Sequence, residues 1–374
     1  MVNTVVVGLG RSGQGAARLL RATGHRVAVI DSGQSEQIEQ KAEGLRQQGV
    51  EVQLQAPLAI DSFRPWLDQL QRVVISPGIP WDHPTLEDLR QRDVAVDGEM
   101  AVAWDALKHI PWVGITGTNG KTTVTHLLSH VLCQAGLAAP MGGNMGVSAA
   151  EMALTLKQEQ TCAPDWLVME LSSYQIEAAD RIRPRIGIWT TLTPDHLERH
   201  GTVEAYRAIK RGLLERSDHA IFNADDPDLR QQRQSWTGGT WVSAESARPD
   251  GQPADLWING EGWVCDQSQP LFPAEALAMP GSHNRQNLLL VTAAALQIGL
   301  SPASIEAGLR SFPGVPHRLE PLGRIRNAQV FNDSKATNYD AAAVGLKAMQ
   351  GPVVVLAGGS TKQGDATGWL EELN

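Results

Sequence analysis

Short apolar runs alternate with longer amphipathic segments along most of the chain. TVVVG, RVAVID and RVVISPG come first, and WVGITG, DWLVME, IGIWTTL and HAIFNAD follow. Short runs rich in β-branched residues are typical of buried strands, and the segments between them have the length of helices. Because strands that alternate with helices form parallel sheets with right-handed crossovers, the pattern predicts an α/β protein.

Two interruptions divide this pattern into three expected domains. Pro111 restarts the pattern after a helical stretch, and FPGVPHRLE, over 312–320, breaks a helix with proline and glycine. The expected domains are 1–110, 111–315 and 316–374. The last contains two strand-like runs, QVFNDS and PVVVLAGGS. Since only about 55 residues follow the second break and domains usually have about 100 to 150, we expect this domain to be incomplete.

Two segments depart from the strand–helix alternation. The segment 238–278 carries three tryptophans among turn residues, which predicts a small meander or hairpin. The charge-free stretch 286–305 has the length of a membrane span but contains Gln297, Gly299 and Pro302. We therefore expect a buried helix that ends near Gly299.

Composition narrows the class of protein. The 374 residues include 32 Lys and Arg against 41 Asp and Glu, a formal net charge of -9. That balance disfavours a nucleic-acid-binding face, which is usually basic. Cys133, Cys162 and Cys265 are far apart and form no metal-type pair. With no leader-like start and no expected membrane insertion, these features predict a cytoplasmic protein.

The first candidate site is the turn GLGRSG, Gly8 to Gly13, between a strand and a helix. Its G-x-G-x-x-G spacing allows a tight turn and a close approach of backbone to phosphate, and Asp31 ends the next strand. This combination favours a nucleotide over a tight turn with no ligand. The turn alone would also fit a dehydrogenase.

The second candidate site is TGTNGKTT, between the strand WVGI and a helix. The N–H groups of Gly117 to Gly120 can converge on phosphate oxygens, Lys121 can neutralise the β- and γ-phosphates, and the Thr122 hydroxyl can bind Mg²⁺. The usual first glycine is absent, because Ile115 lies six residues before Lys121 and Gly117 takes its role. The context still favours a phosphate loop.

Strand ends supply candidate metal ligands. Glu170 ends the run DWLVME, and Asp195 and His196 follow the next strand. Ligands collect at such strand ends in parallel sheets. A solvated Glu170 and a helix-capping His196 remain alternatives, since Mg²⁺ prefers oxygen ligands. Lys210 by itself has the pattern of an ordinary exposed helix lysine.

Seven motifs occur in an order that resembles the Mur ligases of peptidoglycan synthesis: TGTNGKTT, MGGNMG, MELSSYQI, TPDHLERHG, GSHNRQN, FPGVPHRLE and NDSKATN. GLGRSG, SPGIP and NDSKATN are similar to the branch that adds D-glutamate. The resemblance implies a Rossmann-like first domain for the UDP part of the substrate. It also implies a central ATP-binding domain with a parallel sheet and a Rossmann-like third domain that helps bind the amino acid.

The implied reaction joins the carboxylate of UDP-N-acetylmuramoyl-L-alanine to the amine of D-glutamate through an acyl phosphate. The implied cofactors are ATP and two Mg²⁺ ions, and the expected state is a monomer. By resemblance Lys121, Glu170, His196 and Lys210 are catalytic. The metal ligands would be Thr122, Glu170, His196 and Lys210, with Lys210 carbamylated, a modification that requires the neutral amine.

The resemblance also assigns binding residues. The expected ATP-binding residues are Gly117, Thr118, Asn119, Gly120, Lys121, Thr122, Thr123, Val124, Asn284, Arg318 and Asp333. The expected substrate-binding residues are Gly10, Arg11, Ser12, Asp31, Ser32, Ser76, Pro77, Gly78, Asn144, Lys335, Thr337 and Lys362.

Other functions stay open at this point. A folylpolyglutamate-type ligase would share the ATP domain, but GLGRSG and NDSKATN tell against it. A muramate:L-alanine ligase differs around the phosphate loop. Members of the D-glutamate branch have a later loop with serine and phenylalanine, which this chain ends before. A nucleotide-sugar-binding fragment without catalysis is therefore the alternative from another class.

Overall fold

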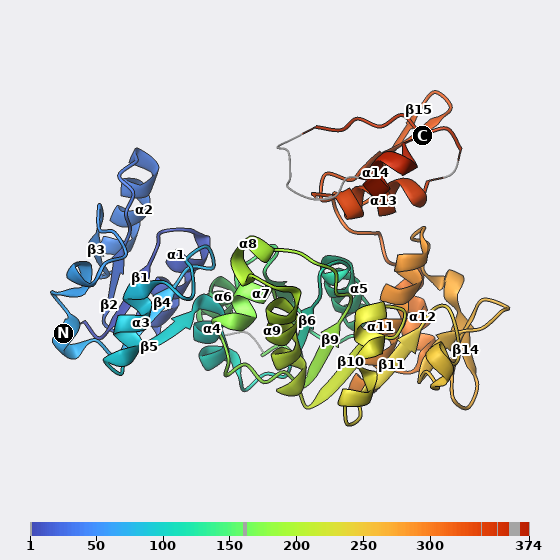
Figure 1. The fold of residues 1–374 in the computed structure, drawn as a ribbon, viewed down its shortest axis with the longest axis horizontal. Helices are drawn as coiled ribbons and strands as arrows, with labels where there is room; N and C mark the ends of the chain where they lie inside the picture. The colour runs from blue at the N-terminus through green and yellow to red at the C-terminus, as the bar shows by residue number, and fades with distance from the viewer. Residues whose placement is uncertain (1, 160–162, 338, 350, 359–366, 374) are drawn as a thin grey trace. The chain divides into compact units, whose positions relative to one another are not determined.

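The computed structural model describes residues 2–159, 163–337, 339–349, 351–358 and 367–373 (Figure 1). They form two compact units, which we describe separately. The first unit comprises Met1–Thr116, Ala138–Trp189 and Pro194–Ala220. The second comprises Gly117–Leu137, Thr190–Thr193 and Ile221–Asn374. The boundaries at 110 and 315 stay a prediction.

The first unit opens with a five-stranded parallel sheet in the order β3-β2-β1-β4-β5. Its central strands are buried, so their β-branched side chains fill both faces, as the apolar runs predicted. The expected Rossmann-like sheet is confirmed. The strands are β1 (Thr4–Val7), β2 (Val27–Ile30), β3 (Glu51–Gln53), β4 (Arg72–Ile75) and β5 (Ala95–Gly98).

Helices connect these strands, and the first of them also packs against two other helices of the unit. α1 buries Ala16, Leu19 and Leu20 on its apolar side and contacts α4 and α6. The elements are α1 (Arg11–Ala22), α2 (Glu36–Arg46), the short η1 (Ile60–Phe63) and η2 (Leu67–Gln69), α3 (Pro84–Gln91), α4 (Glu99–Leu107) and α6 (Ala149–Glu159).

The same unit contains four more parallel strands in the order β9-β6-β8-β7. Ile115 of β6 pairs with Glu170 of β8, so the carboxyl ends of these strands lie side by side. The elements are β6 (Trp112–Thr116), β7 (Met141–Gly143), β8 (Leu167–Glu170), α7 (Ser173–Glu177), β9 (Ile186–Trp189), α8 (Leu197–His200) and α9 (Val203–Glu215).

An ion network joins three parts of the first unit. Asp97 of β5 accepts hydrogen bonds from Arg72 of β4 and from Arg181, each at 2.7 Å. Asp105 of α4 accepts from the same two guanidinium groups, at 3.0 Å from Arg72 and 3.1 Å from Arg181. The Asp97 side chain is only 8% exposed, so the network is partly buried.

The second unit combines a sheet with packed helices. Its strands run β14-β13-β12-β11-β10; β10, β11 and β12 are parallel, whereas β12, β13 and β14 form an antiparallel meander. The meander predicted in 238–278 is thus confirmed for its second part. The strands are β10 (His219–Asn223), β11 (Thr240–Ser243), β12 (Leu256–Ile258), β13 (Trp263–Asp266) and β14 (Pro270–Pro273).

The helices α11 and α12 pack against α5, the helix that follows the phosphate loop. α11 ends at Ile298, and Gly299 caps it in the left-handed region with φ 103°. This is the stop that the sequence predicted, and no described helix is long and apolar enough to cross a membrane. The helices are α5 (Lys121–Gln134), α10 (Pro227–Gln231), η3 (Arg233–Ser235), η4 (Pro249–Gly251), η5 (Ala274–Ala276), α11 (Ser282–Ile298) and α12 (Pro302–Arg310).

The end of the second unit holds the antiparallel hairpin of β15 (Glu320–Ile325) and β16 (Ala328–Asn332), then α13 (Tyr339–Lys347) and α14 (Thr367–Glu372). The strand predicted at QVFNDS is confirmed as β16. The strand predicted at PVVVLAGGS is wrong for residues 352–358, the described part of that run, which form no strand and are exposed. A strand needs a neighbour to pair its N–H and C=O groups, and among the described residues the sheet of β15 and β16 has no third strand.

Candidate functional site

The expected UDP-binding residues gather at one edge of the first sheet. Val7 pairs with Ile30 and with Ile75, so the chain leaves β1, β2 and β4 at the same carboxyl edge. The glycine-rich turn follows β1, Asp31 and Ser32 follow β2, and Ser76 to Gly78 follow β4. A crevice at the carboxyl ends of adjacent parallel strands is where such sheets bind ligands.

The turn itself is tightly packed. A Cβ on Gly13 would lie 1.9 Å from the Gly8 carbonyl oxygen, and Gly8 has a φ of 97°. Both positions therefore require glycine. Ser76 donates from its hydroxyl to the Val7 carbonyl at 3.1 Å, which ties the β4 edge to the turn.

Asp31 organises this turn. Its carboxylate accepts from the N–H of Leu9 at 2.6 Å and from the N–H of Gly33 at 2.8 Å. The resemblance predicted Asp31 as a substrate-binding residue. In the structure both carboxylate oxygens already hold the loops that follow β1 and β2, and each has a second lone pair for a ligand.

The MGGNMG segment lies against Glu170. Asn144 donates from Nδ2 to Glu170 Oε1 at 2.8 Å and from its backbone N–H to the Glu170 carbonyl at 2.9 Å. Arg11, at the start of α1, donates to the Gly146 carbonyl at 3.2 Å. Two predicted substrate-binding segments are therefore in direct contact within the first unit.

Lys210 is not the exposed lysine that its helix pattern suggested. Its side chain on α9 is only 1% exposed. The ammonium Nζ lies 3.4 Å from the Thr116 hydroxyl at the end of β6 and 4.5 Å from the centre of the Tyr206 ring. Glu170 is 2% exposed and ends β8, the neighbour of β6. The end of this sheet thus combines a buried carboxylate with a buried amine.

His196 has left-handed backbone geometry, with φ 52°, at the start of α8. Its ring packs against Tyr174 at 5.2 Å, and the Tyr174 ring stacks on His200 at 5.3 Å. Burial, with the nearby positive charge of Arg199, lowers the pKa of His200 to about 4. His200 Nε2 lies 2.9 Å from the Ser173 hydroxyl, so a neutral ring shares a hydrogen bond there.

The phosphate loop lies in the second unit. Lys121 donates from Nζ to the carbonyls of Gly117 and Thr118, both at 2.8 Å. Gly120, with φ 84°, precedes α5 and supplies no side-chain cap. The N–H groups and positive end of a helix dipole at such a terminus favour a bound anion.

The N–H groups of Thr118 and Asn119, which were expected to face a phosphate, have protein partners. Thr118 donates to the Thr191 carbonyl at 2.8 Å, and Asn119 donates to the Thr191 hydroxyl at 2.9 Å. The N–H groups of Thr118 and Asn119 therefore hold the loop to the residues that follow β9. Thr123 and Val124 are buried in α5.

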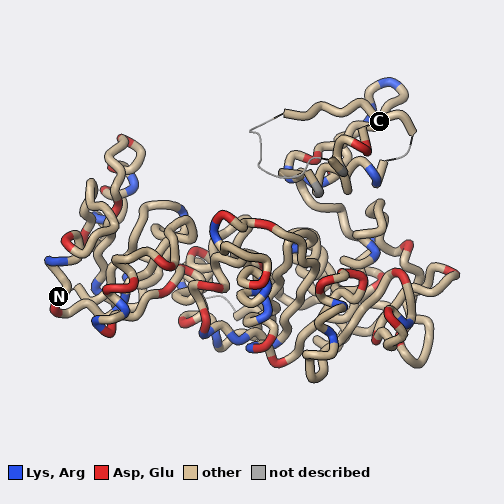
Figure 2. The backbone as a smooth tube through the Cα atoms, in the orientation of Figure 1, with Lys and Arg blue, Asp and Glu red and all other residues tan. Residues whose placement is uncertain are grey.

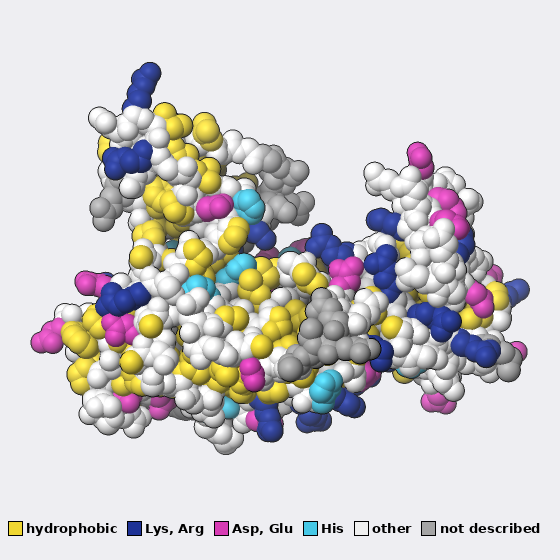
Figure 3. Space-filling view, turned by 180° about the vertical axis from the view of Figure 1, so that it is seen from behind, with side chains coloured by type: hydrophobic (Ala, Val, Ile, Leu, Met, Phe, Trp, Pro, Cys, Tyr) yellow, Lys and Arg dark blue, Asp and Glu magenta, His cyan; other side chains and the backbone are white. Residues whose placement is uncertain are grey.

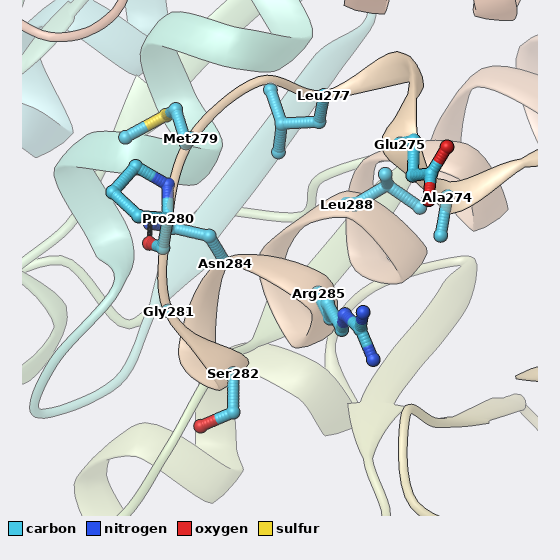
Figure 4. A pocket seen from close by; sticks show the side chains of 10 residues that line it. All are labelled: Ala274, Glu275, Leu277, Met279, Pro280, Gly281, Ser282, Asn284, Arg285 and Leu288. Carbon is cyan, nitrogen blue, oxygen red and sulfur yellow. Dashed lines mark hydrogen bonds between the residues drawn. The ribbon is translucent and has the colours of Figure 1, made fainter. Parts of the chain in front are cut away.

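A pocket of about 340 Å³ lies at the start of α11 (Figure 4). Asn284 and Arg285 line it from the helix, and Met279 and Pro280 line it from the preceding segment. Asn284, predicted to bind ATP, donates from Nδ2 to the Pro280 carbonyl at 2.6 Å and accepts from Asn287 at 3.1 Å. Its side chain shapes the wall of the pocket.

Two further predicted ATP contacts lie near this helix. Burial lowers the pKa of His283 to about 4, and the charge of Arg318 adds to that effect. Burial raises the pKa of Asp333, while the N–H of Leu319, which donates at 3.2 Å, and the Arg318 charge oppose it. Arg318 therefore acts electrostatically on both groups.

The expected D-glutamate contacts are only partly described. Lys335 is exposed, and its N–H donates to the His317 carbonyl at 3.0 Å. Thr337 is exposed as well, and Lys362 lies outside the described residues. Their roles stay predictions.

Among the described residues, no group of three or more His, Cys, Asp or Glu side chains could hold a metal ion. The predicted set of Thr122, Glu170, His196 and Lys210 contains only two such side chains, so it depends on the hydroxyl and on carbamylation.

Charges of both signs are intermingled along the backbone and on the face shown in Figure 3, with no continuous basic stripe in either view (Figures 2 and 3).

Comparisons with known proteins bear on this geometry. A family model of the Mur ligase middle domain matches residues 115–295, and one of the Mur ligase MurD-like N-terminal domain matches residues 2–98. The UDP-N-acetylmuramoylalanine--D-glutamate ligase of Parasynechococcus marenigrum (strain WH8102) is 93% identical over 374 residues, which cover 100% of this chain and 81% of that protein. The chain belongs to the UDP-N-acetylmuramoylalanine--D-glutamate ligase family.

A second ligase of the same name, from Synechococcus sp. (strain CC9605), is 68% identical over 373 residues, with the same two coverages. Among solved structures, a UDP-N-acetylmuramate-alanine ligase from Thermotoga maritima has a TM-score of 0.56 at 20% identity and covers 93% of this chain and 77% of that one. A murein peptide ligase from Psychrobacter arcticus has a TM-score of 0.55 at 21% identity, with coverages of 93% and 75%. These two structures support the Mur ligase fold.

Sequence reasoning missed the threonines that hold the phosphate loop. Thr190, Thr191 and Thr193 lie in TTLT, directly after the apolar strand IGIW. Thr190 and Thr191 hold the loop through their hydroxyls, and Thr193 holds it through its backbone. Hydroxyl residues at the end of a buried strand were the available signal, because most buried hydroxyls have a hydrogen-bond partner.

Proposed function

We propose that the chain is an ATP-dependent ligase that joins D-glutamate to UDP-N-acetylmuramoyl-L-alanine during peptidoglycan precursor synthesis. The observation that carries this proposal is the 93% identity, over the whole chain, to a ligase whose name states that reaction. Two separate glycine-rich turns, one after β1 and one after β6, support it because the reaction uses two nucleotides.

The chemistry needs an activated carboxylate. A carboxylate oxygen of the alanine attacks the γ-phosphorus of ATP, ADP leaves, and an acyl phosphate forms. The amine of D-glutamate then attacks the acyl carbon, phosphate leaves, and the amine proton is lost. Lys121, held over the loop carbonyls, would stabilise the charge on the transferring phosphate.

Mg²⁺ would neutralise phosphate oxygens and orient them. We assign its ligands to Thr122, Glu170, His196 and a carbamylated Lys210, with two ions in total. Glu170 and Lys210 fit this role because both are almost fully buried. Glu170 ends β8, and the Lys210 Nζ on α9 lies 3.4 Å from the Thr116 hydroxyl at the end of the neighbouring β6.

The UDP part would lie at the carboxyl edge of β1, β2 and β4. Gly10, Arg11 and Ser12 would face its phosphates at the start of α1, and Asn144 would contact the reacting end of the substrate. The remaining contacts there would come from Asp31, Ser32, Ser76, Pro77 and Gly78.

The pocket beside Asn284 would receive the base of ATP, with Arg318 and Asp333 toward its ribose and phosphates. Lys335, Thr337 and Lys362 would meet the D-glutamate carboxylates. Since ATP and the UDP-linked precursor are both substrates, the cytoplasm is the proposed compartment. A monomer is the proposed state, which sedimentation would measure.

Phosphate release is the first test. The chain is incubated with ATP, Mg²⁺ and UDP-N-acetylmuramoyl-L-alanine, with or without D-glutamate. Release that depends on D-glutamate, and not on L-glutamate or L-alanine, supports the proposal. Binding of the UDP substrate with no release under any condition contradicts it and favours the alternative of a nucleotide-sugar-binding chain.

Carbamylation has its own test. Lys210→Ala should lose activity that short carboxylates partly restore, because they replace the carbamate oxygens. The exposed Lys108→Ala is the matched control. A carbamate signal in ¹³C NMR after incubation with ¹³C-bicarbonate should appear in wild type and in Lys108→Ala. Its presence in Lys210→Ala would contradict the assignment.

A further inference from the structure

Four consecutive residues, Thr190–Thr193, lie against the phosphate loop within the second unit. We call them the threonine segment. Thr118 of the loop donates from its N–H to the Thr191 carbonyl at 2.8 Å. Its hydroxyl donates to the Thr193 carbonyl at 3.0 Å and accepts from the Thr193 N–H at 3.0 Å. Loop and segment therefore pair through backbone and side chain.

Asn119 is held at both ends of its backbone. Its N–H donates to the Thr191 hydroxyl at 2.9 Å. Its carbonyl accepts from the Thr190 hydroxyl at 2.5 Å, and the Thr191 hydroxyl lies within reach of the same carbonyl at 3.3 Å. One hydroxyl can accept and donate at once, so Thr191 serves both ends.

The threonine segment is itself fixed by groups at the end of β10. Asn223, which is 1% exposed, donates from Nδ2 to the Thr190 carbonyl at 3.0 Å. Asp226 accepts from the Leu192 N–H at 2.8 Å and also caps α10 through the Leu229 N–H at 3.0 Å. The segment is thus a rigid support for the loop.

Gly117 of the loop matches this support. A Cβ on Gly117 would lie 1.9 Å from the Thr190 hydroxyl oxygen, whereas one on Gly120 would lie 2.9 Å from Asn287 Oδ1 and only in ordinary contact, at 3.4 Å, with Thr190 Cβ. The threonine segment occupies the space that a side chain at position 117 would take, so this position requires glycine.

We propose that the threonine segment holds the phosphate loop in its ATP-binding shape, with Thr191 as the main positioning residue. The Asn119 carbonyl and the Gly120 N–H belong to one planar trans peptide and point in opposite directions. Hydrogen bonds that turn the carbonyl toward Thr190 and Thr191 therefore turn the Gly120 N–H away from them, ready for a phosphate oxygen. The proposal rests on ATP being the substrate of the proposed function.

The test compares Thr191→Val with Thr191→Ser, since valine keeps the shape and serine keeps the hydroxyl. Calorimetry with ATP and Mg²⁺ measures the Kd directly. We expect Thr191→Val to raise that Kd about tenfold, equal to about 1.4 kcal/mol, the scale of losing one hydrogen bond to a partly buried N–H. Thr191→Ser should bind within about twofold of wild type. The KM for UDP-N-acetylmuramoyl-L-alanine should not change in either variant.

Thr292→Val is the matched control. Thr292 is fully buried in α11, where its hydroxyl donates to the Leu288 carbonyl at 2.8 Å, and it should leave the Kd for ATP unchanged. Folded Thr191→Val that binds ATP like wild type would overturn the proposal. If that variant does not fold, Thr190→Val takes its place, because it removes the other hydroxyl that donates to the Asn119 carbonyl. Binding of ATP like wild type by folded Thr190→Val would then overturn the proposal. Wild type that binds ATP but releases no phosphate would instead count against the proposed function.

Discussion

Glu99 should make the stability of the first unit depend on pH. It is the first residue of α4, is 2% exposed, and accepts from the Ala150 N–H of α6 through Oε1 at 2.5 Å. Among the described residues its Oε2 has no hydrogen-bond partner. Burial raises the pKa of this carboxyl from 4.5 to about 7, and the Ala150 hydrogen bond only partly opposes the shift.

The sign and size follow from linkage. Below pH 4.5 Glu99 is protonated in both folded and unfolded chains and carries no penalty. Between pH 4.5 and 7 the unfolded chain releases this proton and the folded chain keeps it, so stability falls as pH rises. The change from 4.5 to about 7, at 1.36 kcal/mol for each pH unit, corresponds to about 3 kcal/mol of stability, which is lost above pH 7.

Glu99→Gln removes this titration and keeps the shape. The free energy of unfolding is measured from urea curves for both proteins. The value for the variant minus the value for wild type should be about 2–3 kcal/mol larger at pH 8 than at pH 5. Any effect of the glutamine amide on stability that does not depend on pH is the same at pH 5 and pH 8, so it cancels in this comparison. Amide exchange at Ala150, corrected for its intrinsic pH dependence, reports the same change locally. Glu36→Gln, at the exposed start of α2, is the control without such a trend. A difference that stays flat from pH 5 to 8 would refute the reasoning.

Three other predictions concern the second unit. Lys121→Ala should lower turnover in the phosphate-release assay about 10²–10³-fold with the melting temperature unchanged; an unchanged rate would remove the lysine from catalysis. Gly117→Ala should abolish ATP binding in calorimetry, since φ is 146° and the added Cβ meets Thr190, whereas Gly44→Ala in open space on α2 should bind normally. In a Cys162→Ser background the exposed Cys133 should react with a thiol reagent at pH 8 well before Cys265, whose thiol pKa is raised by burial; equal rates would contradict the burial of Cys265.

The pattern of the chain predicted the elements better than it predicted their contacts. Buried β-branched runs identified the central strands, and Gly299 marked the end of α11, because these signals are local. The strand expected at PVVVLAGGS fails since strand formation depends on a partner, which local sequence does not supply. Lys210 shows the same limit: its helix pattern suggested exposure, whereas packing of α9 against the strand ends buries it.

For the candidate site, too, local features could be predicted from the sequence and contacts between distant segments could not. The glycine spacing predicted both turns, because only glycine allows the positive φ and close contacts at Gly8 and Gly117. The role of Asp31 in holding Leu9 and Gly33, and of Thr191 in holding Asn119, could not be predicted. The bonds of Asp31 to Leu9 and of Thr191 to Asn119 join residues far apart in the chain, so they depend on how neighbouring strands are arranged, whereas the bond of Asp31 to Gly33 is local.

The ion network of Arg72, Asp97, Asp105 and Arg181 has a consequence for ionic strength. Two guanidinium groups and two carboxylates balance in charge, and the bonds to Asp97 are short and shielded from solvent. Mobile ions screen exposed pairs beyond about 8 Å at physiological salt but act weakly on partly buried ones. The contact between the first sheet and the segment around Arg181 should therefore persist in concentrated salt. Isolated surface pairs such as Arg185 with Asp218 contribute little to stability under those conditions.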